Sequence, residues 1–156
     1  MKTIGIVKLN DDAKIPSYAH TEDAGMDLFS NENNYTLKVG ERKGFSTGIK
    51  MEIPDGYAGL VWDKSGLAFK KGIKTMAGVI DSTYRGEIVI ILINLGSSEY
   101  LVEKGSKIAQ MIIQKIEHFE ISVHGSSGLR KAENRECTDG RQAGLHALSP
   151  GCHRSM

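Results

Sequence analysis

Apolar residues recur at every second position along most of the chain, the spacing of a strand that buries one face. Residues 35–39 alternate cleanly, and residues 45–53 alternate around Gly48 before a turn-forming Pro-Asp-Gly. Further strands are expected at residues 3–9, 57–62, 100–102 and 108–116. Short strands at intervals of roughly 8–12 residues, separated by glycine-containing turns, predict an all-β sandwich or barrel.

Two segments depart from this alternation. Residues 86–94 (GEIVIILIN) are apolar and β-branched almost throughout, which predicts a strand buried on both faces. Only residues 65–71 have a helical pattern, and they are long enough for about two turns.

The composition and net charge of the chain exclude several classes of protein. The 156 residues fit one domain, and the net charge of +1 with dispersed lysines and arginines gives no basis for nucleic-acid binding. No apolar stretch is long enough to cross a membrane, and the N-terminus lacks a secretory signal, so we expect a cytoplasmic protein. Both cysteines lie after residue 136, so the body of the fold needs no disulfide.

A change in composition divides the chain. Residues 1–123 carry the strand pattern, whereas residues 124–156 are rich in Gly, Ser, Arg and Cys and lack it. We therefore expect a β domain over residues 1–123 and an atypical tail over residues 124–156, disordered or partly non-native.

Asp27 and Ser65 lie in the first two of four polar segments. Asp27 stands between hydrophobic residues in AGMDL; taken alone, it could be a turn aspartate that bonds its own backbone. Ser65, in DKSGLA, is placed as a helix N-cap, with the free N–H of Gly66 behind it and the cation of Lys64 before it. Such a helix start can bind phosphate, although a plain helix cap is equally expected.

The third segment, AGVIDSTYRGE, spans residues 77–87. Residues 79–80 and 88–89 are expected to form two arms of a hairpin. Asp81 directly follows the first apolar arm, where an unpaired carboxylate is costly to bury, so it is a candidate general base that orients a water. Tyr84 could pack its ring against a flat ligand or a deoxyribose. The alternative is a simple turn in which Asp81 caps the backbone.

The fourth segment, GSKIAQ, leads from a turn into a strand. Its Lys107 and Gln110 are polar groups among hydrophobic residues, and the Gln110 amide could donate to a phosphate oxygen. The alternative is an amide that is satisfied within the sheet.

In this order, AGMDL, KSGLA, GVIDSTYRGE and GSKIAQ resemble the first four motifs of the trimeric dUTPase family, over residues 3–121. The resemblance implies a distorted, jelly-roll-like β-barrel that forms a homotrimer with shared active sites. It implies hydrolysis of dUTP to dUMP and pyrophosphate, which limits uracil in DNA and supplies dUMP for dTMP synthesis.

The same resemblance implies roles for single residues. Asp81 would activate the water that attacks the α-phosphorus, and Tyr84 would exclude a ribose 2′-hydroxyl. The backbone of Gly78, Val79 and Ile80 would recognise uracil. The phosphates would be held by Lys64, Ser65, Gly66, Lys107 and Gln110. Mg²⁺ would be bound mainly by the phosphates, with Asp27 nearby.

Two departures from the family pattern bear on function. Lys64 and Lys107 stand where the family usually has arginine, which trades a planar fork for a point charge. Residues 125–128 (GSSG) match the end of the fifth motif, but the arginine and aromatic residue before them are absent. The lid over the nucleotide is then deleted or altered, so a lid-less dUTP-binding or regulatory protein is the alternative. A dCTP deaminase, which would need a glutamate at position 91, is disfavoured because Ile91 stands there.

Overall fold

The computed structural model describes residues 3–124. These residues form ten strands and one short helix. The elements in chain order are β1 (Gly5–Lys8), β2 (Met26–Phe29), β3 (Tyr35–Leu37), β4 (Arg42–Glu52), β5 (Tyr57–Trp62), α1 (Ser65–Lys71), β6 (Ile73–Met76), β7 (Val79–Ile80), β8 (Glu87–Asn94), β9 (Tyr100–Val102) and β10 (Lys107–Lys115).

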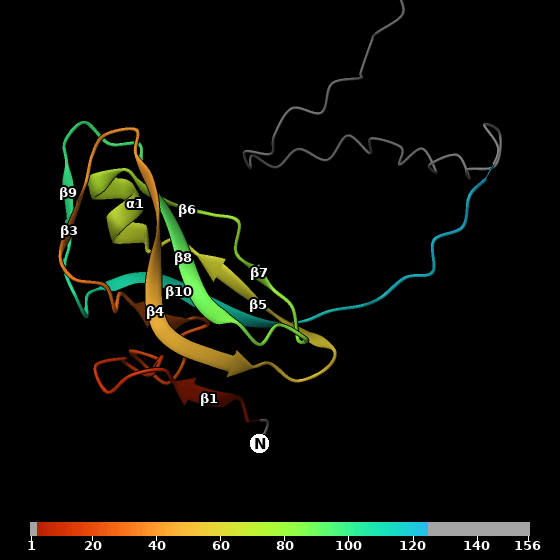
Figure 1. Cartoon of the computed structure of the whole chain (residues 1–156). Coiled ribbons are helices and arrows are strands. Elements are labelled where there is room, and N and C mark those ends of the chain that lie inside the picture. Colours follow the sequence, from red (N-terminus) through yellow and green to blue (C-terminus); the bar gives the residue numbers. More distant parts are fainter. Residues whose placement is uncertain (1–2, 125–156) are drawn as a thin grey trace, which may run out of the picture. The chain divides into compact units, whose positions relative to one another are not determined.

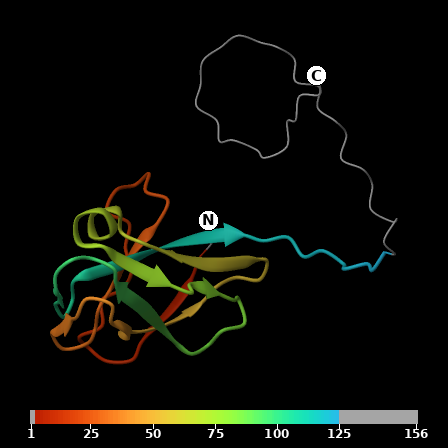
Figure 2. The same ribbon diagram turned by 90° about the horizontal axis from the view of Figure 1, so that it is seen from above.

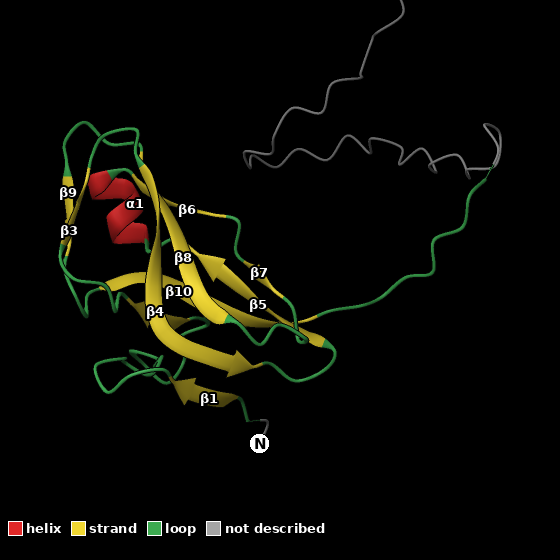
Figure 3. Ribbon diagram, viewed as in Figure 1, coloured by secondary structure: helices red, strands yellow, loops and turns green. Residues whose placement is uncertain are grey.

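The strands form three antiparallel sheets (Figure 3). The first has the order β1-β4-β8-β6 and the second the order β2-β10-β5-β7, while β3 and β9 form a separate pair. Most neighbours in a sheet are distant in sequence, so the chain passes repeatedly between sheets. The expected all-β fold with one short helix is confirmed, and the packed sheets are jelly-roll-like.

One apolar core lies between the two four-stranded sheets (Figures 1 and 2). Phe45, Ile90 and Leu92 enter it from the first sheet, and Leu28 and Met111 enter from the second. All five are at most 1% exposed, so the alternating residues of both sheets supply the apolar burial that stabilises the fold.

The strand over residues 86–94 is confirmed as β8, but the prediction that it is buried on both faces is wrong. Its residues alternate between buried and more exposed positions, and Val89 and Ile91 are 46% and 37% exposed. Only the face toward β2, β5 and β10 is covered within the chain, because the β1-β4-β8-β6 sheet packs on one side.

The described part of the chain contains no helix that is long and apolar enough to cross a membrane. The compact β unit extends to Phe119. The division expected after residue 123 stays a prediction, because residues 125–156 lie outside the described part.

Candidate active site

Four of the expected site residues, Asp27, Lys64, Lys107 and Gln110, lie together on the β2-β10-β5-β7 sheet; we call them the Asp27 cluster. Gln110 of β10 stands opposite Asp27 of β2 on one side and opposite Trp62 of β5 on the other. Opposed residues of antiparallel strands share a face, so the register brings Asp27 and Gln110 together. Lys64 comes two residues after the end of β5, and Lys107 begins β10.

Asp27 is the centre of charge in this cluster. It is 4% exposed, and its carboxylate forms ion pairs with the ammonium groups of Lys64, through Oδ1, and Lys107, 2.7 Å from Oδ2. Burial by itself raises the pKa of Asp27, but the Lys107 and Lys64 ammonium groups together outweigh it and hold the pKa below its usual value. The two cations exceed the one anion, so the cluster retains positive charge for an anionic ligand.

Gln110 is tied to the backbone next to Lys64. Its Nε2 donates to the Asp63 carbonyl at 2.8 Å, so the expectation of an amide bonded within the sheet region is partly met. A primary amide has two N–H donors, so this one bond does not use up its capacity to donate.

Asp63 is a structural residue of the site that the sequence did not single out. Its Oδ1 accepts hydrogen bonds from the Thr75 N–H and hydroxyl, both at 2.6 Å, and Lys74 lies 2.8 Å from Oδ2. Burial raises the pKa of Asp63, but the hydrogen bonds from Lys74 and Thr75 lower it overall. Asp63 thus joins the segment that carries Lys64 to β6. The only signal in the sequence was its position next to Lys64.

The helix that follows begins at Ser65 as expected, but the prediction of a Ser65 N-cap is wrong. Lys64 occupies the N-cap position with extended backbone, and no side chain caps the first turn. Ser65 is instead the first helical residue. It is exposed and follows Lys64 of the Asp27 cluster. Gly66 follows in open space, because a Cβ there would meet no atom within 4 Å.

The expected hairpin of residues 79–80 with 88–89 is also wrong. Val79 and Ile80 form β7, which pairs with Leu60 and Gly59 of β5, whereas β8 pairs with β4 and β6 in the other sheet. The chain changes sheets at Ala77 and Gly78, whose φ angles are 58° and 113°. β7 has only two residues, and both pair with β5, so β7 does not pair with β8.

Gly78 meets the conditions that only glycine satisfies. Its carbonyl accepts a hydrogen bond from the Val61 N–H at 2.8 Å, and a Cβ at Gly78 would lie 2.9 Å from the Val61 carbonyl oxygen. Gly78, Val79 and Trp62 line a small cavity of about 180 Å³ with neighbouring residues of β5 and β6. Two of the three residues expected to recognise the base, Gly78 and Val79, therefore border an open hollow.

Asp81 and Tyr84 lie in the turn between β7 and β8. Asp81 is exposed, so the expectation of a buried carboxylate is wrong for the single chain: β7 lies at the edge of its sheet and the turn projects from it. The Asp81 carbonyl accepts a hydrogen bond from the Tyr84 N–H at 3.1 Å. One turn therefore holds both residues, and its carboxylate is accessible to water.

The two groups of site residues lie toward opposite ends of β5. Ile80 pairs with Gly59, and Gln110 pairs with Trp62, three residues farther along β5. These two positions are about 10 Å apart at 3.3 Å per residue. From there the chain runs to Asp81 in one direction and to Lys64 in the other, and Figure 1 shows α1 and β7 on different sides of the unit. Asp81 and the Asp27 cluster therefore do not meet within one chain.

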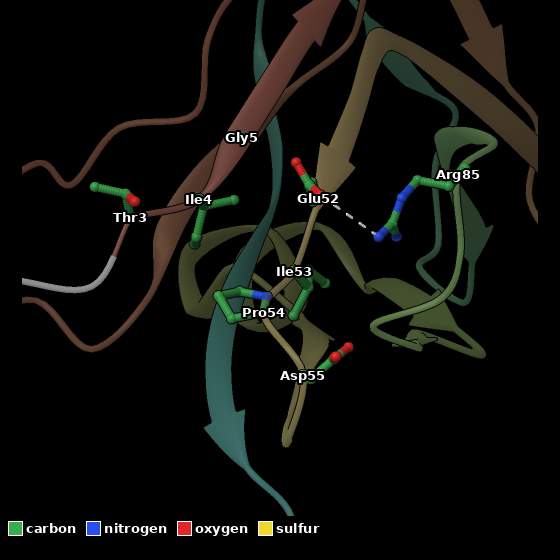
Figure 4. Close-up of a pocket in the computed structure, with 8 residues that line it drawn as sticks. All are labelled: Thr3, Ile4, Gly5, Glu52, Ile53, Pro54, Asp55 and Arg85. Carbon is green, nitrogen blue, oxygen red and sulfur yellow. Dashed lines mark ion pairs between the residues drawn. The ribbon is translucent and has the colours of Figure 1, made fainter.

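Arg85, which follows Tyr84, points toward Glu52 at the end of β4 (Figure 4). Their charged groups are 3.8 Å apart, and Arg85 also donates to the Ser82 and Tyr84 carbonyls. These two side chains border an open cavity of about 530 Å³, and residues 3–5 line its other side. Arg85 thus lies between the Asp81 turn and the end of β4.

The described residues contain no group of three or more His, Cys, Asp or Glu side chains that could hold a metal ion. Both oxygens of Asp27 face lysine ammonium groups, so Asp27 is not free to act as a direct ligand.

The sequence is similar to those of known proteins. Residues 11–140 match the dUTPase family. The deoxyuridine 5′-triphosphate nucleotidohydrolase of Clostridioides difficile is 44% identical over 135 residues, covering 85% of this chain and 92% of the relative. The enzyme of the same name from Clostridium novyi (strain NT) is 54% identical over 111 residues, covering 70% and 78%.

Solved structures show the same likeness. The dUTPase of Staphylococcus bacteriophage 80alpha, in complex with dUPNHPP, has a TM-score of 0.76 and 26% identity, and the match covers 84% of this chain and 94% of that one. A mutant dUTPase from phage phi11 of S. aureus, described with a structural Mg(II) ion, has a TM-score of 0.75 and 25% identity, with 82% and 100% covered.

Proposed function

The chain belongs to the dUTPase family, and we propose that it acts as a dUTP diphosphatase, which hydrolyses dUTP to dUMP and pyrophosphate. The observation that supports this proposal is that the fold presents two separate groups of site residues, here called half-sites. One is the cationic Asp27 cluster, and the other is an exposed Asp81 that follows shortly after Gly78 and Val79, which line the 180 Å³ cavity. The substrate is a soluble nucleotide, which suits a cytoplasmic enzyme that limits dUTP and supplies dUMP.

In the proposed reaction Asp81 is the general base. Its carboxylate orients a water and accepts a proton from it as the water oxygen attacks the α-phosphorus. A new phosphorus–oxygen bond forms, and the bond from the α-phosphorus to the bridging oxygen breaks, so the electron pair leaves with pyrophosphate. No covalent intermediate is needed. Exposure of Asp81 supports this role, because water can reach it.

The Asp27 cluster would hold the triphosphate. Lys64 and Lys107 supply cations, Gln110 supplies an amide donor, and Ser65 and Gly66 lie beside them at the start of α1. These donors are fixed before the substrate arrives, because Asp27 positions both lysines and the Asp63 carbonyl positions Gln110. Fixed donors stabilise developing negative charge without reorganisation during the reaction.

Mg²⁺ fits this arrangement as a companion of the substrate. When bound, it would neutralise phosphate oxygens of dUTP and so ease departure of pyrophosphate. Asp27 would act on the ion only indirectly, by holding Lys64 and Lys107 near the phosphates that carry it.

The base would be recognised by the backbone of Gly78, Val79 and Ile80. A hydrogen bond from Val61 of β5 holds the Gly78 carbonyl, and Gly78 and Val79 line the 180 Å³ cavity with Trp62. A rigid backbone of this kind would discriminate between bases by shape, and so disfavour the methyl group of thymine.

We propose that the active site is shared between copies of the chain, as a homotrimer. The separation of Ile80 and Gln110 along β5 supports this, because a nucleotide held by the Asp27 cluster of one chain needs Asp81 from another. The apolar face of β8 that the single chain leaves exposed at Val89 and Ile91 also suits contact with a second copy.

The test is release of pyrophosphate from dUTP, dTTP, dCTP and UTP with Mg²⁺, together with release of ammonia from dCTP. We expect rapid pyrophosphate release from dUTP alone and no ammonia. Turnover near background, with measurable dUTP binding, would instead favour the lid-less binding protein. The GSSG segment at residues 125–128 lies outside the described residues, so a chain truncated after Lys131 would test the contribution of the remaining tail.

A further inference from the structure

The ring of Tyr84 lies directly against Gly86. A Cβ at Gly86 would be 2.4 Å from the Tyr84 hydroxyl oxygen and 2.6 Å from Cζ, closer than any real side chain allows. The φ angle of Gly86 is outside the left-handed region. A side chain at this position would therefore displace the ring, whereas the backbone conformation would accept one.

The hydroxyl end of the same ring is held by the next residue. Tyr84 Oη donates to the Glu87 carbonyl at 2.9 Å, so the ring is fixed by contact at Gly86 and by a hydrogen bond at Glu87. The Tyr84 N–H also donates to the Asp81 carbonyl. A shift of the ring would therefore be transmitted within the turn that holds the general base.

Glu87 is itself fixed by its carboxylate. The register between β4 and β8 shifts between Ser46 and Lys50, and Gly48 lies in this irregular stretch with a φ of 69°. Glu87 Oε1 accepts hydrogen bonds from the Gly48 N–H, at 2.8 Å, and from the Ser46 hydroxyl. The carboxylate thus satisfies donors that the ladder leaves free, and it holds residue 87 against β4.

We propose that Gly86 and Glu87 form a seat for Tyr84, and that this seat sets how strongly the enzyme prefers dUTP to UTP. The inference rests on the proposed function, in which Tyr84 packs against the sugar. The ring lies beside Gly86 at its hydroxyl end, and the hydrogen bond from that hydroxyl to Glu87 opposes a shift that would admit a 2′-hydroxyl. Gly86 and Glu87 are positioning residues, since they act on the substrate through Tyr84.

The test is the ratio of kcat/KM for dUTP to kcat/KM for UTP. Gly86→Ala should lower this ratio by about tenfold or more, because the new methyl group displaces the ring. Glu87→Ala should lower it by a smaller factor, and Glu87→Gln, which keeps the acceptor oxygen, should restore it toward the wild-type value. Tyr84→Phe, which loses only the hydroxyl bond, should resemble Glu87→Ala.

Two control variants distinguish an effect on the position of the Tyr84 ring from a general loss of structure. Thr47→Val removes a hydrogen bond from Thr47 to the Ile88 carbonyl in the same irregular stretch, but it leaves the seat intact, so the ratio should stay unchanged. In a Tyr84→Ala background, Gly86→Ala should have no further effect on the ratio, since no ring remains to be displaced.

A folded Gly86→Ala variant with the wild-type ratio would overturn the inference, as would an effect that persists without the Tyr84 ring. If Gly86→Ala does not fold, an unchanged ratio in both Tyr84→Phe and Glu87→Ala would overturn it instead. Absence of dUTP hydrolysis by the wild-type chain would refute the proposed function rather than the seat.

Discussion

The Asp27 carboxylate accepts a hydrogen bond from the Lys64 ammonium group, across 37 residues of sequence. Asp27 lies in a buried strand, whereas Lys64 is the N-cap residue of the helix at the proposed phosphate site. The ion pair therefore has two roles: it fixes the position of Lys64, which is proposed to bind substrate, and it contributes to the stability of the fold. A change in the charge of Asp27 should affect both stability and substrate binding.

The stability of the protein should depend on the ionisation of Asp27. Because the folded-state pKa is lowered from the ordinary value of 3.8, the ion pairs stabilise the fold fully above that value. This stabilisation is lost as the pH falls below 3.8 and through the lowered pKa. Asp27→Asn should lower the free energy of unfolding by about 1–3 kcal/mol at pH 7. It should also make the free energy of unfolding fall less between pH 7 and pH 3, as measured by urea unfolding at both pH values.

The matched control for this change is Asp12→Asn. Asp12 also pairs with a lysine, Lys104 at 2.7 Å, but Asp12 is 69% exposed. Surface pairs of this kind contribute little, so Asp12→Asn should leave unfolding at pH 7 nearly unchanged. Equal effects of the two substitutions would contradict a special role for the buried pair.

Asp81→Asn should abolish turnover without harming the fold. Removal of a general base typically costs about 10²–10⁴-fold in rate, and the exposed position of Asp81 means that the amide disturbs no packing. We expect a wild-type melting temperature and retained dUTP binding by calorimetry, with kcat reduced over that range. Turnover within a few-fold of wild type would exclude Asp81 as the base.

The sequence predicted the locally determined parts of the fold well. The bounds of β5 and α1 were predicted correctly, because the alternation of residues 57–62 and the helical pattern of 65–71 are each complete within one segment. The four residues of β6 were missed as a strand, and β7 was assigned the wrong neighbour. Pairing with a distant strand leaves no periodic signal in so short a segment.

The site could be predicted residue by residue, but its geometry could not. The motifs identified the four residues of the Asp27 cluster, which the sheet register then brings together. Nothing in the local sequence indicated that Asp81 is exposed, or that the turn lies far along β5 from the cluster. Gly86 and Glu87 were missed because the reason for them, the position of the Tyr84 ring, exists only in three dimensions.

Gly78→Ala should destabilise the protein and weaken catalysis together. A Cβ at Gly78 would meet the Val61 carbonyl oxygen at 2.9 Å, and the φ of 113° is unfavourable for alanine. The combined cost should reach about 1–3 kcal/mol or more in urea unfolding, and KM for dUTP should rise. Gly56→Ala is the control: Gly56 also has a positive φ, of 77°, but nothing lies within 4 Å of its Cβ position. A Gly56→Ala variant that is as impaired in KM would show that backbone strain alone, and not the contact with β5, explains the result.

Mixing two inactive variants should restore activity if the site is shared between chains. Asp81→Asn lacks the base, and Gln110→Ala lacks a phosphate donor from the other end of β5. In a mixed oligomer some sites combine Asp81 of one chain with Gln110 of another. With equal amounts and random assembly, roughly one quarter of the sites are intact, since each of the two positions is filled correctly half of the time.

The control for mixing uses two residues of the same turn. Asp81→Asn combined with Tyr84→Ala should give no recovery, because both residues come from one chain at any site and neither variant supplies both. Pyrophosphate release after co-refolding measures the outcome, and native mass spectrometry with one isotopically labelled variant confirms that mixed oligomers form. If mixed oligomers of Asp81→Asn and Gln110→Ala form without activity, the two half-sites do not meet across a subunit contact. The separation along β5 would then have to be closed by movement within a single chain.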